Sequence, residues 1–464
     1  MAAGSDRRAA SLALTALSLS MLLSSLGTSI ANVALPTLAE AFAAPFQAIQ
    51  WIVLAYLLAI TTLIVSVGKL GDLLGRRRLL LGGVALFTAA SLACGVAPNL
   101  PTMIVARAVQ GLGAAVMLAL SMALVGETVS KEKTGSAMGL LGTMSAVGTA
   151  LGPSLGGVLI AAFDWRAIFL VNVPLGLVAM LLVARYVPTE RRDAMARTVR
   201  FDVIGTLLLA LTLGAYALAM TLGRGHFGAL NAALLAAALI GGVVFVVVET
   251  RVASPLLRPA MFRDRTLTAG FAMSALVATV MMTTLVVGPF YLARALGLDA
   301  ALVGITLSAG PAVAALSGVP AGRVVDRFGA QGMTAAGLFA MAAGALLLAA
   351  MPSSYGVPGY VGAIVVLTAG YALFQAANNT AVMTGVSADR RGVVSGLLNL
   401  SRSLGLITGA SAMGAIFAFA SASADVATAS PEAVASGMRV TFAIATALIV
   451  VALPSAFAGR KSVR

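Results

Sequence analysis

Two arginines lie inside long apolar runs, where a charged side chain is costly and its presence favours a functional role. Arg107 lies in the run that begins at Met103. Arg402 lies about nine residues inside another run, too deep for its guanidinium to reach water without strain. We predict a functional role for both arginines. The structural alternative for Arg107 is a set of hydrogen bonds to backbone carbonyls or to Gln110.

Amide side chains also lie at membrane depth. Asn378 and Asn379 follow Gln375 by one helical turn in an apolar run. Amides in lipid either line a cavity or form hydrogen bonds between helices, and the sequence supports both interpretations equally. Asn378 and Asn379 are therefore included among the candidates for the substrate path.

Carboxylates are placed differently from the arginines. All 16 Asp and Glu residues lie in connections or at the ends of apolar runs. A site for cationic substrates would be expected to use acids at depth for pairing and for proton exchange. If the chain moves a solute across the membrane, the pattern favours a neutral or anionic solute, with any proton exchange carried by peripheral acids such as Glu40, Glu127 or Asp72.

Metal, cofactor and enzyme chemistry have no support in the sequence. Its single cysteine, Cys94, lies in an apolar run, and its single histidine, His226, lies in a short connection. These residues cannot form a Cys/His metal cluster or a nucleophile–histidine catalytic set. A GxxxxGK[ST] phosphate loop is absent from the sequence, which argues against a built-in ATPase. We expect no cofactor, no metal and no enzymatic activity.

The elements that position these residues are membrane spans. Hydrophobic residues make up 60% of the chain and charged residues 10%, and the mean hydropathy is +1.02. Soluble domains carry about 25% charged residues, and an apolar run of about 20 residues crosses a bilayer. We predict an all-α polytopic membrane protein with fourteen transmembrane helices. Their expected ranges are 12–36, 49–67, 79–96, 103–125, 137–161, 168–187, 203–222, 229–248, 267–292, 301–319, 333–351, 361–383, 393–419 and 440–458.

Basic residues indicate the orientation of these spans. Of the 30 Lys and Arg residues, 24 fall on one side of the predicted membrane, four on the other and two within spans. The positive-inside rule then places both termini in the cytoplasm. Membrane orientation therefore explains the +14 net charge, and a role in nucleic-acid binding is not needed to explain it. We expect a multi-pass monomer in the inner or plasma membrane, surrounded by lipid, and the composition suggests a bacterial source.

One loop motif occurs twice, after the second and the tenth predicted spans. Its copies share the spacing Gly, Asp, Gly: Gly68, Asp72 and Gly75, with Arg76 beside the last, and Gly322, Asp326 and Gly329. A repeat of this kind predicts two six-helix halves, residues 1–187 and 266–464. Residues 188–265 would then contain cytoplasmic linkers and two inserted helices. We favour a gating role for the motif over a tight, positively charged loop.

The fifth predicted span contains glycines at every fourth residue. Gly148, Gly152 and Gly156 share one helix face, and Pro153 lies among them. Relative to Ala, each Gly costs about 1 kcal/mol and Pro about 3 kcal/mol in a helix in water. In lipid, small residues instead allow close helix approach. We predict a bent helix whose glycine face seals the two halves where they slide against each other.

With these motifs established, the chain resembles the major facilitator superfamily, in its fourteen-span drug:H+ antiporter branch. The resemblance covers nearly all of the chain and includes four motifs in the expected order. They are the loop motif with Gly68, Asp72, Gly75 and Arg76, the fourth-span motif with Arg107, Gln110, Gly111 and Gly113, the antiporter motif with Gly139, Gly148, Gly152, Pro153, Gly156 and Gly157, and the first-span motif with Asn32, Ala34, Leu35 and Pro36.

The resemblance implies secondary active efflux by alternating access, with the substrate bound between the halves. It links Arg107 to proton coupling or substrate contact and adds Asn32 and Gln110 to the candidate path. Gly27 stands where this branch usually carries an acid, so the resemblance does not identify the proton site. We predict export of amphipathic drugs or metabolites, neutral or anionic, in exchange for protons.

Two other functions stay open. One is a facilitator or importer of a small metabolite, because the same fold supports many functions. The other is a non-transporting membrane receptor, which would be expected to carry a substantial soluble domain. No predicted connection is long enough to fold as one.

Overall fold

The computed structural model describes residues 2–129, 134–188, 202–222, 228–252, 264–383, 391–421 and 429–457. Every regular element in these ranges is a helix. The first part of the chain forms α1 (Ala2–Val33), α2 (Leu35–Ala41), α3 (Phe46–Ile49), α4 (Trp51–Leu74), α5 (Arg76–Gly95), α6 (Leu100–Thr128), α7 (Thr134–Ala162), α8 (Ala167–Leu170) and α9 (Asn172–Tyr186). The rest forms α10 (Val203–Thr221), α11 (Ala229–Arg251), α12 (Arg265–Phe290), the π-helix η4 (Tyr291–Ala295), α13 (Ala300–Phe328), α14 (Ala330–Ala350), the 3₁₀ turn η5 (Ser353–Tyr355), α15 (Gly356–Met383), α16 (Arg391–Thr408), the π-helix η6 (Gly409–Met413), α17 (Gly414–Ala420) and α18 (Pro431–Phe457).

Each predicted span falls on one of these helices or on a consecutive group of them, so the all-α prediction is confirmed. Within the described residues, thirteen helical segments are long and apolar enough to cross a membrane. The fifth predicted span lies on α7 (29 residues), of which only the apolar stretch Val147–Ala162 falls within the residues that could be tested for length. The count of fourteen and the cytoplasmic position of both termini therefore stay predictions.

The two copies of the loop motif have the same backbone geometry. Gly75 joins α4 to α5 with φ 90° and ψ 122°, and Gly329 joins α13 to α14 with φ 86° and ψ 145°. This left-handed region is accessible to glycine at little cost, which explains why both copies end on Gly. In the first copy, the side chain of Asp72 lies outside the described residues; in the second, Asp326 is exposed.

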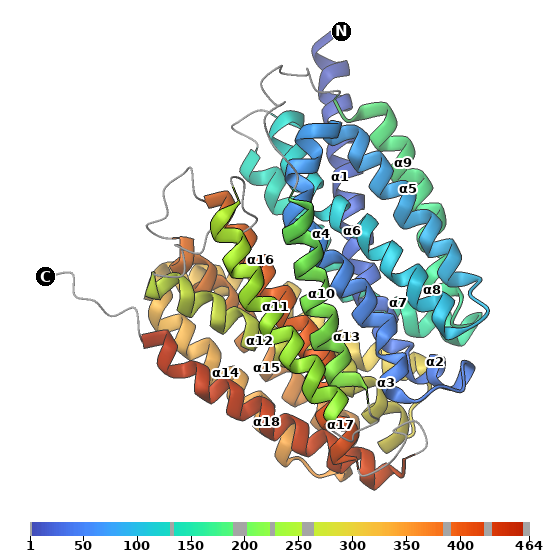
Figure 1. Ribbon diagram of the computed structural model, residues 1–464, viewed down its shortest axis with the longest axis vertical. Coiled ribbons are helices and arrows are strands. Elements are labelled where there is room, and N and C mark those ends of the chain that lie inside the picture. Colours follow the sequence, from blue (N-terminus) through green and yellow to red (C-terminus); the bar gives the residue numbers. More distant parts are fainter. Residues whose placement is uncertain are drawn as a thin grey trace, which may run out of the picture.

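The helices form two groups with a pair between them. Figure 1 shows α1–α9 gathered on one side and α12–α18 on the other. α10 contacts α4 of the first group and η6 of the second, and α11 packs on α10. α10 is fastened to α4 by a hydrogen bond between the Ser66 and Thr206 hydroxyls (2.9 Å) and by one from the Trp51 indole to Thr221 (3.0 Å). The predicted boundaries near residues 188 and 265 border ranges outside the described residues and stay predictions.

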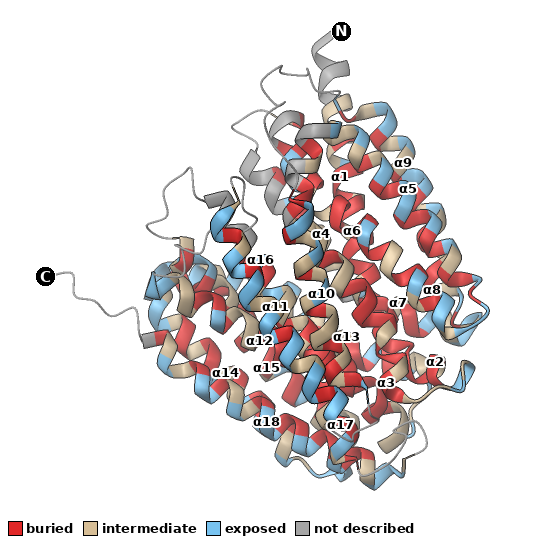
Figure 2. Cartoon of the chain, in the orientation of Figure 1, coloured by how far each residue is buried: buried red, intermediate tan, exposed pale blue. Residues whose placement is uncertain are grey.

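The outward faces of the helices are apolar and exposed. On α11, for example, Leu239 is 67% exposed and Val243 64% exposed. Figure 2 shows pale blue exposed positions along the outer faces of α11, α14 and α18, and red buried positions where helices meet. Large apolar side chains on a continuous outer surface are expected of helices in contact with lipid.

The glycine face of α7 packs against α1, within the same half of the protein. A Cβ on Gly148 would meet the Leu22 carbonyl, and one on Gly156 would lie 2.6 Å from a Val33 methyl carbon. Sealing between the halves falls instead to a neighbouring face of the same helix. The predicted role of Gly148, Gly152 and Gly156 is therefore corrected. These glycines allow α7 to pack closely on α1, because α1 is the helix next to their face.

Contact between the halves occurs where α7 meets α13. A Cβ on Gly157 would lie 2.6 Å from the Ala300 carbonyl oxygen, and a Cβ on Gly304 would meet the Pro153 carbonyl and lie 2.9 Å from the Gly157 Cα. Two backbones approach this closely only where both lack side chains. Gly157 and Gly304 therefore form the close crossing between the halves.

Further contacts join the halves through α3 and α4. The Phe46 ring lies between Phe290 and Phe417 of the other half, with centroid distances of 4.8 and 5.6 Å. The Gln50 amide donates a hydrogen bond to the Ala410 carbonyl in η6 (2.7 Å). These contacts, with the glycine crossing, hold the two halves together on one side of the cavity described below.

We expect Gly304→Ala to lower the free energy of unfolding by about 1–3 kcal/mol, because the added methyl overpacks a backbone contact. Gly318→Ala in the same helix is the matched control, since nothing lies within 4 Å of its Cβ position. Thermal unfolding of the purified variants in detergent measures the difference. Equal midpoints for the two variants would contradict the assigned crossing.

Candidate functional site

Arg107 of α6 is fully buried and, together with its partner Gln110, forms hydrogen bonds to three neighbouring helices. Its Nε donates to the Ile52 carbonyl (2.9 Å), one Nη to the Gly27 carbonyl (3.1 Å) and the other Nη to Gln110 Oε1. Gln110 in turn donates to the Ser91 hydroxyl (2.7 Å). Each guanidinium nitrogen thus has an acceptor. Arg107 connects α6 to α1 and α4, and Gln110 connects α6 to α5.

Gly27 contacts Arg107 through its backbone, and no carboxylate among the described residues pairs with this arginine. The backbone carbonyl of Gly27 accepts the hydrogen bond, and a Cβ at this position would lie 2.8 Å from the Tyr56 hydroxyl oxygen and 3.2 Å from the Phe87 ring. The Arg107 guanidinium carbon lies 4.1 Å from the centroid of the Tyr56 ring, which stabilises the cation. This arrangement supports the structural alternative for Arg107, and its role in coupling stays a prediction.

The predicted amides lie apart from one another. Asn32 is buried in α1 and donates to the Thr28 carbonyl of its own helix (2.9 Å). Asn378 is buried and donates to the Gly270 carbonyl (3.2 Å), beside a second cavity of about 750 Å³ between α12, α14, α15 and α18, whereas Asn379 is exposed. None of these three amides lines the cavity that contains Arg402.

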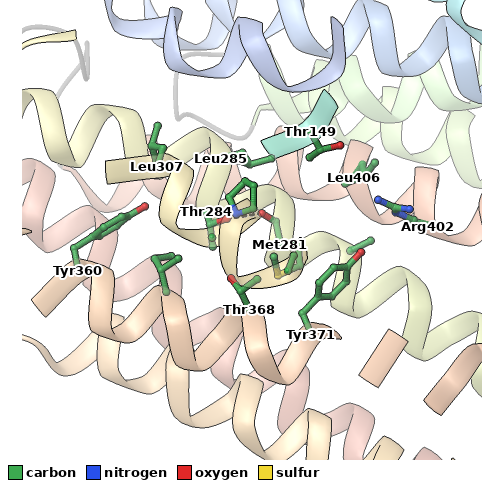
Figure 3. A pocket seen from close by; sticks show the side chains of 15 residues that line it. Thr149, Met281, Thr284, Leu285, Leu307, Tyr360, Thr368, Tyr371, Arg402 and Leu406 are labelled. Carbon is green, nitrogen blue, oxygen red and sulfur yellow. Dashed lines mark hydrogen bonds between the residues drawn. The ribbon is translucent and has the colours of Figure 1, made fainter. Parts of the chain in front are cut away.

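Arg402 lies at a cavity of the second half that α7 of the first half borders. The cavity has a volume of about 760 Å³ with its open mouth included, and α7, α12, α13, α15 and α16 form its wall. Its apolar lining comes mainly from Met281, Leu285 and Leu307. Figure 3 shows Arg402 at one side of this cavity, with Thr149 of α7 opposite the residues of α12 and α15.

The Arg402 guanidinium is available to a ligand. It is exposed to the cavity, and it forms no hydrogen bond or ion pair with any residue in the described part of the chain. A guanidinium presents five donors and remains charged, so it binds carboxylate, sulfonate or carbonyl oxygens well and repels cations. This cavity is chemically suited to amphipathic ligands that are neutral or anionic.

Hydroxyl groups complete the cavity, and sequence analysis missed them. The hydroxyl-bearing residues Tyr360, Thr368 and Tyr371 line it from α15, together with Ile364, and Thr284 lines it from α12. The spacing of four, four and three residues places the α15 positions on one helix face. That pattern was visible in the sequence, but no sequence signal distinguishes a cavity face from a face packed against another helix.

Three prolines lie inside the helices that line the cavity. Pro153 of α7, Pro289 of α12 and Pro311 of α13 each lack the N–H that would bond the carbonyl four residues earlier. Those carbonyls belong to Thr149, Leu285 and Leu307, and all three residues line the cavity. Backbone of this kind is tolerated at membrane depth where it faces protein or a cavity.

The acids proposed for coupling are only partly described. The side chains of Asp72 and Glu127 lie outside the described residues, whereas Glu40 forms an ion pair with Arg294 of η4. Asp202 and Glu249 are buried together near Gly205, at the start of α10 and the end of α11. Among the described residues, no three His, Cys, Asp or Glu side chains are grouped as metal ligands.

Replacing Arg107 tests whether its hydrogen bonds are structural. Arg107→Lys is expected to lower the free energy of unfolding by about 2 kcal/mol or more, because one ammonium cannot reach three separated acceptors. Arg402→Lys is the control and should unfold at the wild-type temperature. If Arg107→Lys kept the wild-type midpoint but lost gradient-dependent transport, the coupling role would be favoured instead.

Comparison with known proteins agrees with this architecture. The sequence profile described as the Major Facilitator Superfamily matches residues 17–410 and 283–462. The multidrug resistance protein Stp of Mycobacterium tuberculosis is 33% identical over 411 residues, which cover 88% of this chain and 76% of Stp. The riboflavin transporter RibZ of Clostridioides difficile is 28% identical over 396 residues, covering 85% of this chain and 86% of RibZ.

A solved structure has the same fold. It is that of a bacterial homolog of the human lysosomal transporter Spinster in an inward-facing, unoccupied conformation, with a TM-score of 0.70 and 17% sequence identity. The match covers 97% of this chain and 96% of that one. The chain therefore belongs to the Major Facilitator Superfamily and is a multi-pass membrane transporter with bacterial relatives, not an enzyme.

Proposed function

We propose that this protein is a secondary active exporter of amphipathic compounds that are neutral or anionic, working by alternating access and proton antiport. The observation that carries the proposal is the Arg402 guanidinium, which has no partner among the described residues, at a largely apolar cavity of the second half that Thr149 of α7 borders. A cation at the binding site attracts anions and dipolar oxygens and repels permanently cationic drugs.

The names of the relatives support transport of amphipathic molecules, and the name of Stp supports resistance by efflux. One is named for multidrug resistance and another for riboflavin, which is a neutral, aromatic and polar compound. The antiporter motif also favours export and membership of the fourteen-span branch. In this assignment α7 supplies the fourteenth span and both termini are cytoplasmic.

Coupling through a peripheral acid is supported by the ion pair between Glu40 and Arg294. Glu40 follows the first span, whereas Arg294 belongs to the opposite half, so the pair joins the halves at the face assigned to the outside. A proton arriving from outside would neutralise Glu40 and break the pair. The Glu40 side chain is 62% exposed, so the pair contributes modestly, and its loss would shift the conformational equilibrium about fivefold at most.

Transport into inverted membrane vesicles with an acidic interior tests the substrate class. We expect naphthalene-2-sulfonate and riboflavin to accumulate, and the dication propidium to be excluded. Arg402→Gln should reduce sulfonate uptake about tenfold by removing the cation that binds the anion. Robust accumulation of propidium would contradict the neutral or anionic preference, and uptake that ignores the pH gradient would favour a facilitator.

Glu40→Gln tests the peripheral coupling site. We expect naphthalene-2-sulfonate uptake by this variant to depend less steeply on the pH gradient, because the ion pair can no longer respond to protons. Asp164→Asn is the matched control, since Asp164 pairs with Arg166 within one half (2.7 Å). Equal gradient dependence in wild type and Glu40→Gln would exclude Glu40 as the coupling acid.

A further inference from the structure

The hydroxyl of Tyr360 is buried in the cavity wall without a hydrogen-bond partner on the protein. Tyr360 is only 1% exposed, and its Oη is among the buried side-chain atoms that bond to no other residue in the described part of the chain. A buried phenol usually finds a partner, because leaving its O–H unbonded costs free energy. A group that the fold keeps unbonded at the wall of a binding cavity is a candidate for ligand recognition.

The surrounding packing sets the position of this hydroxyl before a ligand binds. The Tyr360 ring stacks on Tyr291, with centroids 6.0 Å apart and an interplanar angle of 25°. Its Oη occupies the space that a Cβ on Gly288 would take, so the glycine makes room for the hydroxyl. Pro289 follows that glycine and bends α12 at the same level. The ring is therefore positioned from two helices while its polar atom receives no hydrogen bond from either.

Arg402 and Tyr360 lie at opposite sides of the cavity. Figure 3 shows Tyr360 on the left and Arg402 on the right, with Met281 and Thr284 between them. The Thr284 hydroxyl donates to the carbonyl of Met281 in its own helix (2.7 Å), so it is already engaged. The wall between the two polar groups therefore combines apolar contact from Met281 with the hydroxyls of Thr368 and Tyr371.

We propose that Tyr360 determines specificity: its hydroxyl, which is shielded by α12 in this conformation, turns into the cavity when a ligand binds. There it donates a hydrogen bond to an oxygen at one end of an amphipathic substrate whose anionic end lies at Arg402. The substrate class is an organic anion with an apolar, preferably planar, middle and an oxygen atom opposite its charge. This inference rests on the proposed function of the Arg402 cavity and adds the second contact that selects among its ligands.

The test compares two ligands that differ only at the end assigned to Tyr360. The probes are 6-hydroxynaphthalene-2-sulfonate and naphthalene-2-sulfonate, titrated calorimetrically into the full-length protein in lipid nanodiscs, with empty nanodiscs subtracted. Wild type is expected to bind the hydroxylated probe about tenfold more tightly. Tyr360→Phe should bind both probes with the wild-type affinity for the parent sulfonate. Wild type without a preference, or a preference kept by Tyr360→Phe, overturns the inference.

Tyr371→Phe is the matched control. Tyr371 lines the same cavity from the same helix but is only partly buried, so its hydroxyl also reaches solvent. This variant should keep the tenfold preference; loss of the preference here would assign recognition to Tyr371 instead and overturn the role of Tyr360.

Two further measurements separate the possible failures. Arg402→Gln should weaken both sulfonates by a similar factor and preserve their ratio. If both bind with wild-type affinity without Arg402, or wild type binds neither, the proposed function fails and this inference falls with it. Tyr360→Phe should unfold at the wild-type temperature or above, because its hydroxyl has no partner to lose. A lower midpoint would show a structural role and overturn the inference on its own.

Discussion

Close approach of helix backbones holds this protein together. Apolar side chains gain little by leaving lipid for one another, so helices associate through packing at small residues. α7 uses two adjacent faces in this way, Gly148 and Gly156 against α1, and Gly157 against Gly304 of the other half. Because the second crossing depends on backbones alone, it is compact and can separate without exposing large buried side chains, which suits a contact that must open during transport.

The second constraint is the satisfaction of polar groups in a medium without water. Arg107 and Arg402 are both arginines at membrane depth, yet their surroundings differ completely. Arg107 has acceptors for every guanidinium nitrogen and with Gln110 ties four helices together, whereas Arg402 faces a cavity without a partner among the described residues. One cation therefore contributes to the fold of the first half, and the other is left to the ligand. The neutral hydroxyl of Tyr360, like the Arg402 cation, has no hydrogen-bond partner among the described residues.

The sequence predicted the positions of the helices correctly, because long apolar runs have few alternatives to helix in lipid. It also predicted the repeat, and Gly75 and Gly329 share one backbone conformation. It did not find the cavity. Tyr360, Thr368 and Tyr371 resemble any scattered polar residues on an apolar helix until the neighbouring helices are placed. The glycine stripe was assigned to the wrong partner for the same reason, since helical spacing defines a face but not the helix that covers it.

The sequence by itself determined the class of the protein, the course of its helices, their repeat and the family, because hydrophobic length, charge distribution and glycine motifs are local properties. Only the tertiary structure decided which polar residues meet. In the sequence, Arg107 and Arg402 look alike because each lies inside an apolar run. Their difference arises from neighbours far away in the chain, such as Gly27, Ile52 and Tyr371. Hydrogen-bond partners and cavities are set by packing across helices, which no local pattern encodes.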